Sequence, residues 1–347
     1  MSDIHRIYFE PVDIEMEVGE EENILDAAFR QGIHLMHGCR EGQCSACKSY
    51  VLDGDIQMAR YSTFACNDAE VEEGYVLLCR SHAFSDCTIE LLNFDEEELL
   101  NSAPLQQVKT QVVELVDHTH DIVGIKLRPV EPTSFEFKAG QYAELEIPGS
   151  TDRRSFSLAT TPGTDHLEFV IKKYPGGRFS ALLEDGITVG DAIDLHGPYG
   201  NFTLKNGHVL PIVLMAGGAG MAPVLGLLRH LSQTGDTRRI RFYYGARTVS
   251  DLFYLDEIAA LGKTLADFEF VVALSESSDG ADRLGVAVAD GFVTTAVKDR
   301  EPELHRAELY MCGPPPMVDA ALEMAKELAL PDDQVFYDKF TTSVGDD

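Results

Sequence analysis

The stretch GCREGQCSACKSYVLDG, residues 38–54, places three cysteines within nine positions. Four residues separate Cys39 from Cys44, two separate Cys44 from Cys47, and 31 separate Cys47 from a fourth cysteine, Cys79, in YVLLCRSH. This C-x4-C-x2-C pattern with a distant fourth cysteine is the spacing of plant-type [2Fe-2S] centres. Each iron takes two thiolates in tetrahedral geometry, so one tight loop supplies three ligands and a separate segment supplies the fourth. We therefore expect these four cysteines to hold a binuclear cluster.

A zinc site with four thiolate ligands is the alternative, but such sites more often show paired C-x2-C knuckles. Gly38 and Gly42 favour the cluster, because a loop that wraps one needs unusual φ angles and backbone donors close to sulfur. Cys66 and Cys87 fall outside the pattern, and we expect them to be small buried apolar residues.

Length and composition describe an ordinary globular protein of several domains. The 347 residues exceed what one hydrophobic core usually supports, and 44% are apolar. No apolar run approaches the roughly 18 residues that span a bilayer, and the N-terminus alternates polar and apolar residues, unlike a signal peptide. Seven cysteines, an odd and clustered set, do not indicate a disulfide framework. We expect a cytoplasmic protein.

The charge of the chain is strongly negative and uneven. A net charge of -30 disfavours nucleic-acid and anionic-membrane partners, whose phosphates would be repelled. Residues 1–100 hold 22 Asp and Glu against 6 Lys and Arg. The excess serves solubility on one interpretation, and on the other it forms an acidic docking face for a basic protein partner.

Three segments separate by pattern. Residues 1–95 begin with two alternating runs, at 4–9 and 12–18, and a helix pattern at 23–31 that starts at the capping residue Asn23 and stops at Gly32. An acidic and then polar tract predicts a linker at 96–107. Residues 108–207 contain short strand patterns separated by Gly, Pro and Asp, which predict a closed antiparallel barrel.

Residues 208–347 alternate strand and helix patterns, which predict a doubly wound parallel sheet. The expected strand and helix pairs are PIVLMAGG with APVLGLLRHLSQ, RIRFYYGA with LDEIAALG, FEFVVALS with GVAVADGFVTTAV, and ELYMCGP with PMVDAALEMAKELA.

Two segments predict phosphate binding. In YPGGRFSALL, Gly176 and Gly177 lead into a helix, and free N–H groups at a helix start attract anions such as a cofactor pyrophosphate. The tetrad RSFS, Arg154 to Ser157, lies on a strand pattern nearby, and a strand with a surface arginine is its plainer interpretation.

The second segment is PIVLMAGGAGMAPVLGLLRHL, which runs strand, glycine loop, helix. Gly217, Gly218 and Gly220 allow a backbone to approach a pyrophosphate, and Pro223 suits a first helical turn. Pro223 stands where G-x-G-x-x-G has its last glycine, which argues against an ordinary Rossmann fingerprint. Later, CGPPPM, residues 312–317, follows a strand and lies at a carboxyl end, where open α/β sheets bind ligands.

Together these motifs resemble the ferredoxin-NADP reductase superfamily, specifically the reductase components of bacterial multicomponent monooxygenases. The resemblance covers the whole chain, and its cysteine motifs look most like those of reductases that serve soluble di-iron hydroxylases of the propane and methane type. It implies an α+β and α/β multidomain fold: a β-grasp ferredoxin domain, an antiparallel β-barrel FAD domain and a doubly wound nicotinamide domain.

The resemblance also implies roles for individual residues. On the flavin side, the family motif is Arg-x-Tyr-Ser and this chain has Phe156, so stacking is kept and a phenol hydrogen bond is lost. Arg154 would hold the FAD phosphates, Phe156 would stack near the isoalloxazine, Ser157 would bond near N5, and Lys172, Gly177 and Ser180 would lie along the phosphates and adenine.

On the nicotinamide side, Arg247 and Asp251 of YYGARTVSDL would contact the adenosine ribose. No second basic residue lies nearby for a 2′-phosphate, which favours NADH over NADPH. Cys312, with Gly313 and Pro314, would lie beside the nicotinamide, although a buried cysteine before a proline turn is the plainer interpretation. A C-terminal aromatic would cover the flavin: Phe340 is the candidate, with Phe336 and Tyr337 as alternatives or as core residues.

The expected activity follows from the three carriers. NADH delivers two electrons as a hydride and the cluster accepts one at a time, so FAD must stand between them. The resemblance implies a di-iron hydroxylase as acceptor. Alternatives are a phenol or toluene hydroxylase, a Rieske-type dioxygenase, and, from another class, a zinc-binding interaction module joined to a nucleotide-sensing domain.

Overall fold

The computed structural model describes residues 3–95, 99 and 104–340, and these fall into two compact units that meet in the sequence at Leu105 and Gln106. Most of the predicted linker, residues 96–107, lies outside the described residues; Gln106 and Gln107 belong to a strand. Within the described residues, no helix combines the length and the apolar character needed to cross a bilayer.

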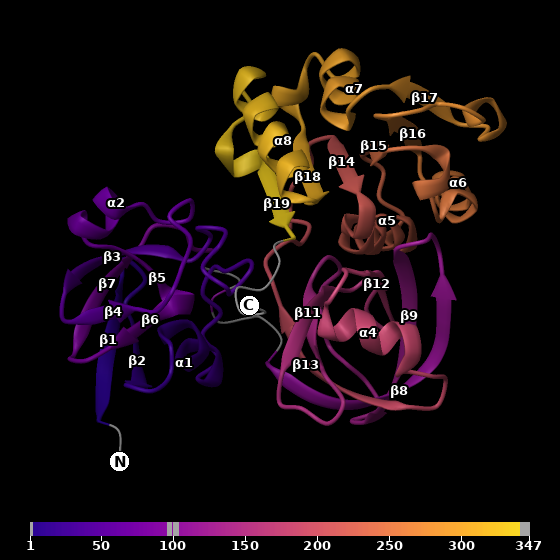
Figure 1. The fold of residues 1–347 in the computed structure, drawn as a ribbon. Helices are drawn as coiled ribbons and strands as arrows, with labels where there is room; N and C mark the ends of the chain where they lie inside the picture. Colours follow the sequence, from indigo (N-terminus) through magenta and orange to yellow (C-terminus); the bar gives the residue numbers. More distant parts are fainter. Residues whose placement is uncertain (1–2, 96–98, 100–103, 341–347) are drawn as a thin grey trace. The chain divides into compact units, whose positions relative to one another are not determined.

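The first unit is a five-stranded sheet with one main helix (Figure 1). The strands lie in the order β2-β1-β7-β3-β5, and β1 and β7 run parallel while their other neighbours run antiparallel. Asn23 caps α1 through its side chain, and Gly32, just beyond the helix, has φ +75°. This is the β-grasp arrangement that the resemblance implied. Its elements are β1 (Ile4–Glu10), β2 (Ile14–Gly19), α1 (Ile24–Arg30), β3 (Lys48–Asp53), β4 (Ile56–Met58), α2 (Asp68–Glu73), β5 (Tyr75–Leu77), η1 (Leu78–Arg80), β6 (Ser81–Ala83) and β7 (Cys87–Leu91).

The second unit begins with an antiparallel sheet in the order β11-β10-β13-β8-β9-β12. Its two outer strands meet through the bridge between Leu158 and Phe169, and the Ala159 amide donates to the Glu168 carbonyl at 2.8 Å, so the sheet closes into the predicted barrel. Phe179 of α4 is buried in the core of this barrel. The elements are β8 (Gln106–Asp117), β9 (Ile122–Glu131), β10 (Tyr142–Glu146), β11 (Arg153–Ser157), β12 (Leu167–Lys172), α4 (Arg178–Asp185) and β13 (Ala192–Tyr199).

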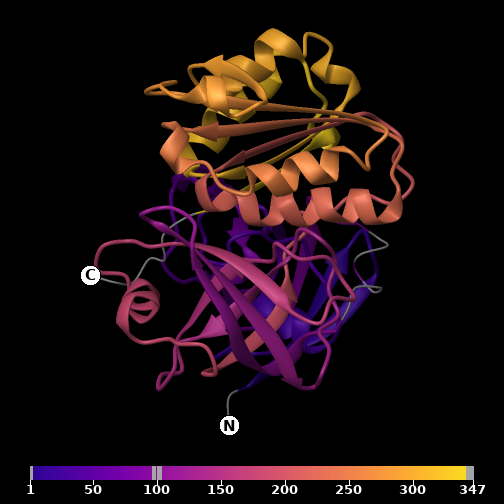
Figure 2. The ribbon, with the colours of Figure 1, turned by 90° about the vertical axis from the view of Figure 1, so that its right-hand side faces the viewer.

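The same unit continues into a six-stranded parallel sheet with helices on both faces (Figure 2). The strand order is β17-β16-β15-β14-β18-β19, so the chain moves outward from β14 on one side and returns to its other side at β18. Apolar residues of α5 and α6 pack on one face, and those of α7 and α8 pack on the other. The elements are β14 (Ile212–Gly217), η2 (Gly218–Gly220), α5 (Met221–Thr234), β15 (Arg239–Ala246), η3 (Val249–Asp251), α6 (Leu255–Gly262), β16 (Asp267–Leu274), η4 (Ala281–Arg283), β17 (Ala287–Asp290), α7 (Val293–Arg300), η5 (Leu304–Arg306), β18 (Glu308–Gly313), α8 (Pro315–Glu327), η6 (Asp332–Gln334) and β19 (Val335–Lys339).

One predicted helix is partly wrong. GVAVADGFVTTAV contains the edge strand β17, which pairs with β16, and α7 begins only at Val293. Gly291, with φ +101°, makes the turn between them. The small apolar residues of this stretch fit a half-buried strand as well as a helix, and pairing along β16 decides between them.

Candidate functional site

The four predicted metal ligands meet as two pairs of thiols in the first unit. Cys47 Sγ lies 3.4 Å from Cys79 Sγ, because β3 and β5 pair at Lys48 and Leu77, next to these cysteines. Cys39 and Cys44 interact through their side chains, and the Cys39 amide donates to Cys44 Sγ at 3.3 Å. Among the described residues, no three His, Cys, Asp or Glu side chains gather around a single point. Two thiolates for each of two irons is the donor set of a [2Fe-2S] cluster.

The loop around the first pair is tightly wrapped. The amides of Glu41 and Gln43 donate to Cys39 Sγ at 3.4 and 3.2 Å, which are bonds that stabilise a thiolate ligand. Gly42 has φ +69°, and a Cβ there would lie 2.8 Å from Arg80 Cγ. A Cβ at Gly38 would lie 2.9 Å from Cys44 Sγ. The loop therefore has no room for a side chain at either glycine, and its residues fit the cluster.

Hydrogen bonding and burial shift the pKa values of three of these thiols. The Cys44 thiol and nearby amides lower the pKa of Cys39 to about 7, and the pKa of Cys44 is raised by its bond to Cys39 and by burial. The pKa of Cys79 is likewise raised, by Cys47 and by burial. Ligation of iron requires thiolates, so metal binding releases the protons that these pairs share.

The predicted flavin residues lie on two elements of the barrel. Arg154, Phe156 and Ser157 belong to β11; Ser157 is buried, and the Phe156 ring packs against Phe179 at 4.7 Å. Gly177 is the N-cap residue of α4, preceded by Gly176 with φ +77°. The Ser180 hydroxyl accepts from the Tyr174 amide at 2.8 Å and so closes the turn at the start of the helix. The turn presents the helix start that the sequence predicted as an anion site.

A cleft of about 270 Å³ lies in the second unit at the carboxyl ends of the parallel strands. It is lined by barrel residues, including Asp121, and by the sheet. Lys172 faces this cleft, with its Nζ 3.2 Å from Asp121 Oδ2. The predicted residues that line it are Lys172, Gly217, Gly218, Arg247, Asp251 and Pro314.

Arg247 and Asp251 form an ion pair at 2.8 Å in this cleft, and Asp251 also completes the cap of η3 with Thr248. Phe292, 71% exposed, also lines the cleft, and no sequence motif indicated this role.

The other predicted nucleotide residues are packed beneath the cleft. Pro223 is buried in the first turn of α5. A Cβ at Gly220 would lie 2.2 Å from the Cys312 carbonyl oxygen, so the glycine loop runs directly against β18. β14 and β18 are neighbours at the point where the strand order reverses, which is where open α/β sheets bind ligands.

Strand β19 brings a carboxyl group that the sequence did not reveal. Asp338 pairs in register with Cys312 and hydrogen-bonds to Ser157, so it joins the flavin strand to the buried cysteine. Burial raises the pKa of Asp338 to about 6. Burial and then the charge of Asp338 raise the pKa of Cys312 well above its ordinary value. Asp338 lies within no recognisable spacing motif, and only the pairing of β18 with β19 places it here.

The three candidate aromatics differ in their surroundings. Phe336 stacks on Tyr310 at 4.5 Å, which is a packing contact, and Tyr337 is exposed. Phe340 is half-buried, and its amide donates to the Gly313 carbonyl at 3.3 Å. Phe340 is thus hydrogen-bonded to the predicted nicotinamide segment.

The first unit has two pairs of thiols suited to a binuclear iron site. The second unit has a nucleotide loop at the switch point of its parallel sheet, next to a barrel. These features define the class of iron-sulfur flavoprotein oxidoreductases. Three family models match successive parts of the chain and agree with this class. Residues 7–83 match the 2Fe-2S iron-sulfur cluster binding domain, residues 109–204 the oxidoreductase FAD-binding domain, and residues 214–323 the oxidoreductase NAD-binding domain.

The individual proteins similar to this chain include reductase components of monooxygenases. The reductase component of propane 2-monooxygenase from Rhodococcus jostii (strain RHA1) is 67% identical over 343 residues, 99% of this chain and 93% of the relative. The reductase component DmpP of phenol 2-monooxygenase from Pseudomonas sp. (strain CF600) is 32% identical, over 98% and 95% of the two chains. The crystal structure of the cytochrome P450 reductase GcoB of Amycolatopsis is similar with a TM-score of 0.85 and 29% identity, over 98% and 99%.

The chain belongs to the monooxygenase reductase components of the ferredoxin-NADP reductase superfamily. It is an oxidoreductase that uses NADH, FAD and a [2Fe-2S] cluster, and electrons pass among them in that order. The family, the fold class and the cofactors predicted from the sequence are confirmed.

Proposed function

We propose that this chain supplies electrons to the di-iron hydroxylase of a soluble alkane monooxygenase of the propane type. The observation that carries the proposal is the contrast among relatives: 67% identity to a propane 2-monooxygenase reductase component against 32% to that of phenol 2-monooxygenase, each over nearly the whole chain. Seven cysteines, none of them in a disulfide and four of them cluster ligands, favour a reducing compartment, and we place the protein in the cytoplasm.

Reconstitution with purified oxygenase components tests which protein accepts the electrons. The NADH-reduced protein is mixed with purified propane, phenol and Rieske-type oxygenase components, and product is measured against NADH consumed. We expect coupled product formation with the propane hydroxylase at a rate at least tenfold above that with the other two. Equal or faster coupling to the phenol hydroxylase would identify the alternative acceptor, the phenol and toluene group.

We further propose roles for the residues of the second unit. The Gly177 turn with Arg154, Phe156, Ser157 and Ser180 would hold FAD, which when bound supplies the conversion of a hydride into single electrons. The switch-point loop with Gly217, Gly218, Gly220 and Pro223 would bind the NADH pyrophosphate, with Arg247 and Asp251 at the ribose. The resemblance placed Lys172 along the FAD phosphates, but Lys172 lines this same cleft, so we assign it to the NADH pyrophosphate instead. Cys312, Gly313, Pro314 and Phe340 would lie at the nicotinamide end, where Asp338 and Ser157 are positioned to hold or move a proton.

A further inference from the structure

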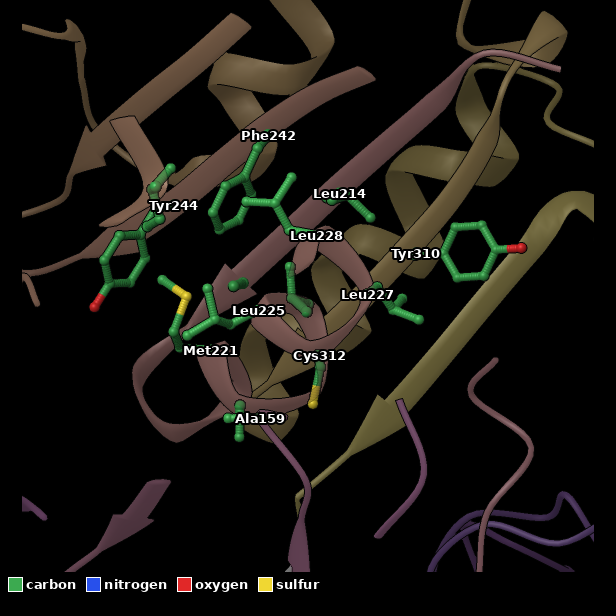
Figure 3. Close-up of a cluster of buried hydrophobic side chains, with 14 of the residues drawn as sticks. Ala159, Leu214, Met221, Leu225, Leu227, Leu228, Phe242, Tyr244, Tyr310 and Cys312 are labelled. Carbon is green, nitrogen blue, oxygen red and sulfur yellow. The ribbon is translucent and has the colours of Figure 1, made fainter. Parts of the chain in front are cut away.

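Helix α5, which begins at the nucleotide loop, lies directly on the end of the flavin strand. Gly226 faces the backbone that follows β11: a Cβ there would lie 2.9 Å from the Leu158 carbonyl oxygen and 3.4 Å from that of Thr160. Ala159 of this backbone is buried in the same apolar cluster as Met221 and Leu225 of α5 (Figure 3). At Gly226 the helix therefore packs so closely against the backbone after β11 that no side chain fits between them.

One turn beyond Gly226, Arg229 bonds the helix to the barrel. Its Nη1 donates to the Ala159 carbonyl oxygen at 2.8 Å and to Glu168 Oε2 at 2.6 Å. Ala159 and Glu168 are the two residues whose backbones close the barrel seam. The side chains of Arg229 and Glu168 are 17% and 6% exposed, so this is a buried pair that joins two parts of the unit.

Helix α6 and its N-cap residue Tyr254 add two further bonds to this pair. The Tyr254 hydroxyl donates to Glu168 Oε1 at 2.6 Å, and Arg229 Nε donates to Glu257 Oε1 at 2.6 Å. Tyr254 has φ +59°, a conformation that is sterically disfavoured for a tyrosine and persists where its surroundings hold it. Both oxygens of Glu168 are thus bonded, and both donors come from the nucleotide-binding part.

We propose that Arg229 and Glu168 form a clasp that positions the two halves of the hydride-transfer site. The clasp holds α5, and with it the glycine loop that starts the helix, in a fixed place on the strand that carries Phe156 and Ser157. Hydride transfer requires donor and acceptor atoms about 3–3.5 Å apart, and a displacement of about 1 Å costs on the order of 100-fold in rate. The inference rests on the proposed placement of FAD at β11 and of NADH at the loop.

The experiment compares R229M, E168Q and the double variant E168Q/R229M with the wild-type holoprotein. R300M is the matched control, since Arg300 is an exposed arginine of the same sheet domain that pairs with Glu269. Anaerobic stopped-flow mixing with NADH and with its 4-deuterated form gives the rate of flavin bleaching and its isotope effect. A second readout needs no turnover: hydrogen exchange at the Ala159 amide, followed in a peptide over residues 155–165.

We expect R229M to slow flavin bleaching at least tenfold and to raise the isotope effect, with less than a threefold change in the KM for NADH. Exchange at the Ala159 amide is expected to accelerate at least tenfold, and R300M to match the wild type in both readouts. The double variant removes both buried charges, so its thermal midpoint should return toward wild type. Its bleaching should stay at least fivefold slow, because the clasp is still absent.

Flavin bleaching in R229M or in the double variant within twofold of wild type overturns the proposal. If R229M does not fold, Y254F decides, since it removes one donor to Glu168 and keeps the ring: a threefold slower bleaching supports the clasp, and an unchanged rate overturns it. Wild-type protein that NADH does not bleach at all contradicts instead the proposed function, so the two failures are distinguishable.

Discussion

At the scale of single residues, sulfur geometry separates a binuclear cluster from a mononuclear metal site. The thiols of Cys39 and Cys44 are in contact, and so are those of Cys47 and Cys79. Hydrogen bonds within the loop bring the first pair together, and the pairing of β3 with β5 brings the second pair together. Cys66 and Cys87 are buried elsewhere in the first unit, as the pattern predicted. We therefore expect one iron at each pair of thiols.

Substitution of Cys79 by serine tests this assignment. C79S leaves Cys47 without its partner, so we expect loss of the cluster and a fall of at least 20-fold in NADH-dependent reduction of cytochrome c. Reduction of ferricyanide, which accepts electrons from flavin directly, should stay within twofold. C66S is the matched control, because the Cys66 thiol makes only a weak contact with the Tyr75 carbonyl at 3.8 Å. Iron analysis and both reduction assays are carried out on C79S and C66S. Equal rates of cytochrome c reduction in C79S and wild type would refute the assignment.

Asp338 gives a second test, through pH. Burial raises its pKa to about 6, above the ordinary value of 3.8, so folding favours the protonated carboxyl. Its stability contribution is therefore present below about pH 4 and is lost as the pH rises through 6. D338N keeps an acceptor for Ser157 and removes the charge. We expect its thermal midpoint to exceed that of wild type by several degrees at pH 8 and by clearly less at pH 5, whereas D332N, at an exposed aspartate of the same segment, should show no such trend. The same difference at both pH values would contradict the raised pKa of Asp338.

At the scale of elements, the glycine loop between β14 and α5 is constrained by the strand that passes beneath it. A Cβ at Gly220 would lie 2.2 Å from the Cys312 carbonyl oxygen, and that oxygen belongs to backbone that cannot move aside as a side chain does. We expect G220A to lower the affinity for NADH at least tenfold and the thermal midpoint by several degrees. G186A is the milder comparison, since its nearest atom is the end of a flexible Leu182 side chain at 3.0 Å. NADH titration of flavin bleaching and thermal unfolding measure both variants, and wild-type affinity in G220A would refute the argument.

Elements also show how far the sequence could predict this molecule. The Asn23 cap and the strand-loop-helix at Gly217 are local signals, and the structure places both elements as expected. The cysteine spacing is a local signal too, and the structure brings its four thiols together as two pairs. Asp338 and the strand β17 could not be predicted, because pairing between strands distant in sequence determines both. The role of Arg229 could not be predicted either, because a single arginine in an apolar helix belongs to no sequence motif. Contacts between elements, which sequence spacing does not encode, supply this part of the candidate site.

At the scale of the whole molecule, charge is divided unevenly between the two units. Residues 1–100, which hold the cluster, carry 22 acidic against 6 basic residues, and the net charge of the chain is -30. Long-range attraction to a basic surface raises association rates and is screened by salt. The unit that holds the electron-donating cluster is therefore the one that a basic acceptor would approach.

Ionic strength tests this steering. Raising it from about 0.01 to about 0.5 M shortens the screening length from about 30 Å to a few ångströms, so we expect turnover with the hydroxylase to fall at least tenfold. Reduction of a neutral quinone under the same conditions corrects for any effect of salt on the NADH step. E72Q/E73Q, which removes two exposed charges from the first unit, should flatten the salt dependence, whereas E323Q/D332N, which removes two from the second unit, should leave it unchanged. If both variants and the wild type respond to salt alike, the acidic excess does not steer docking and serves solubility instead.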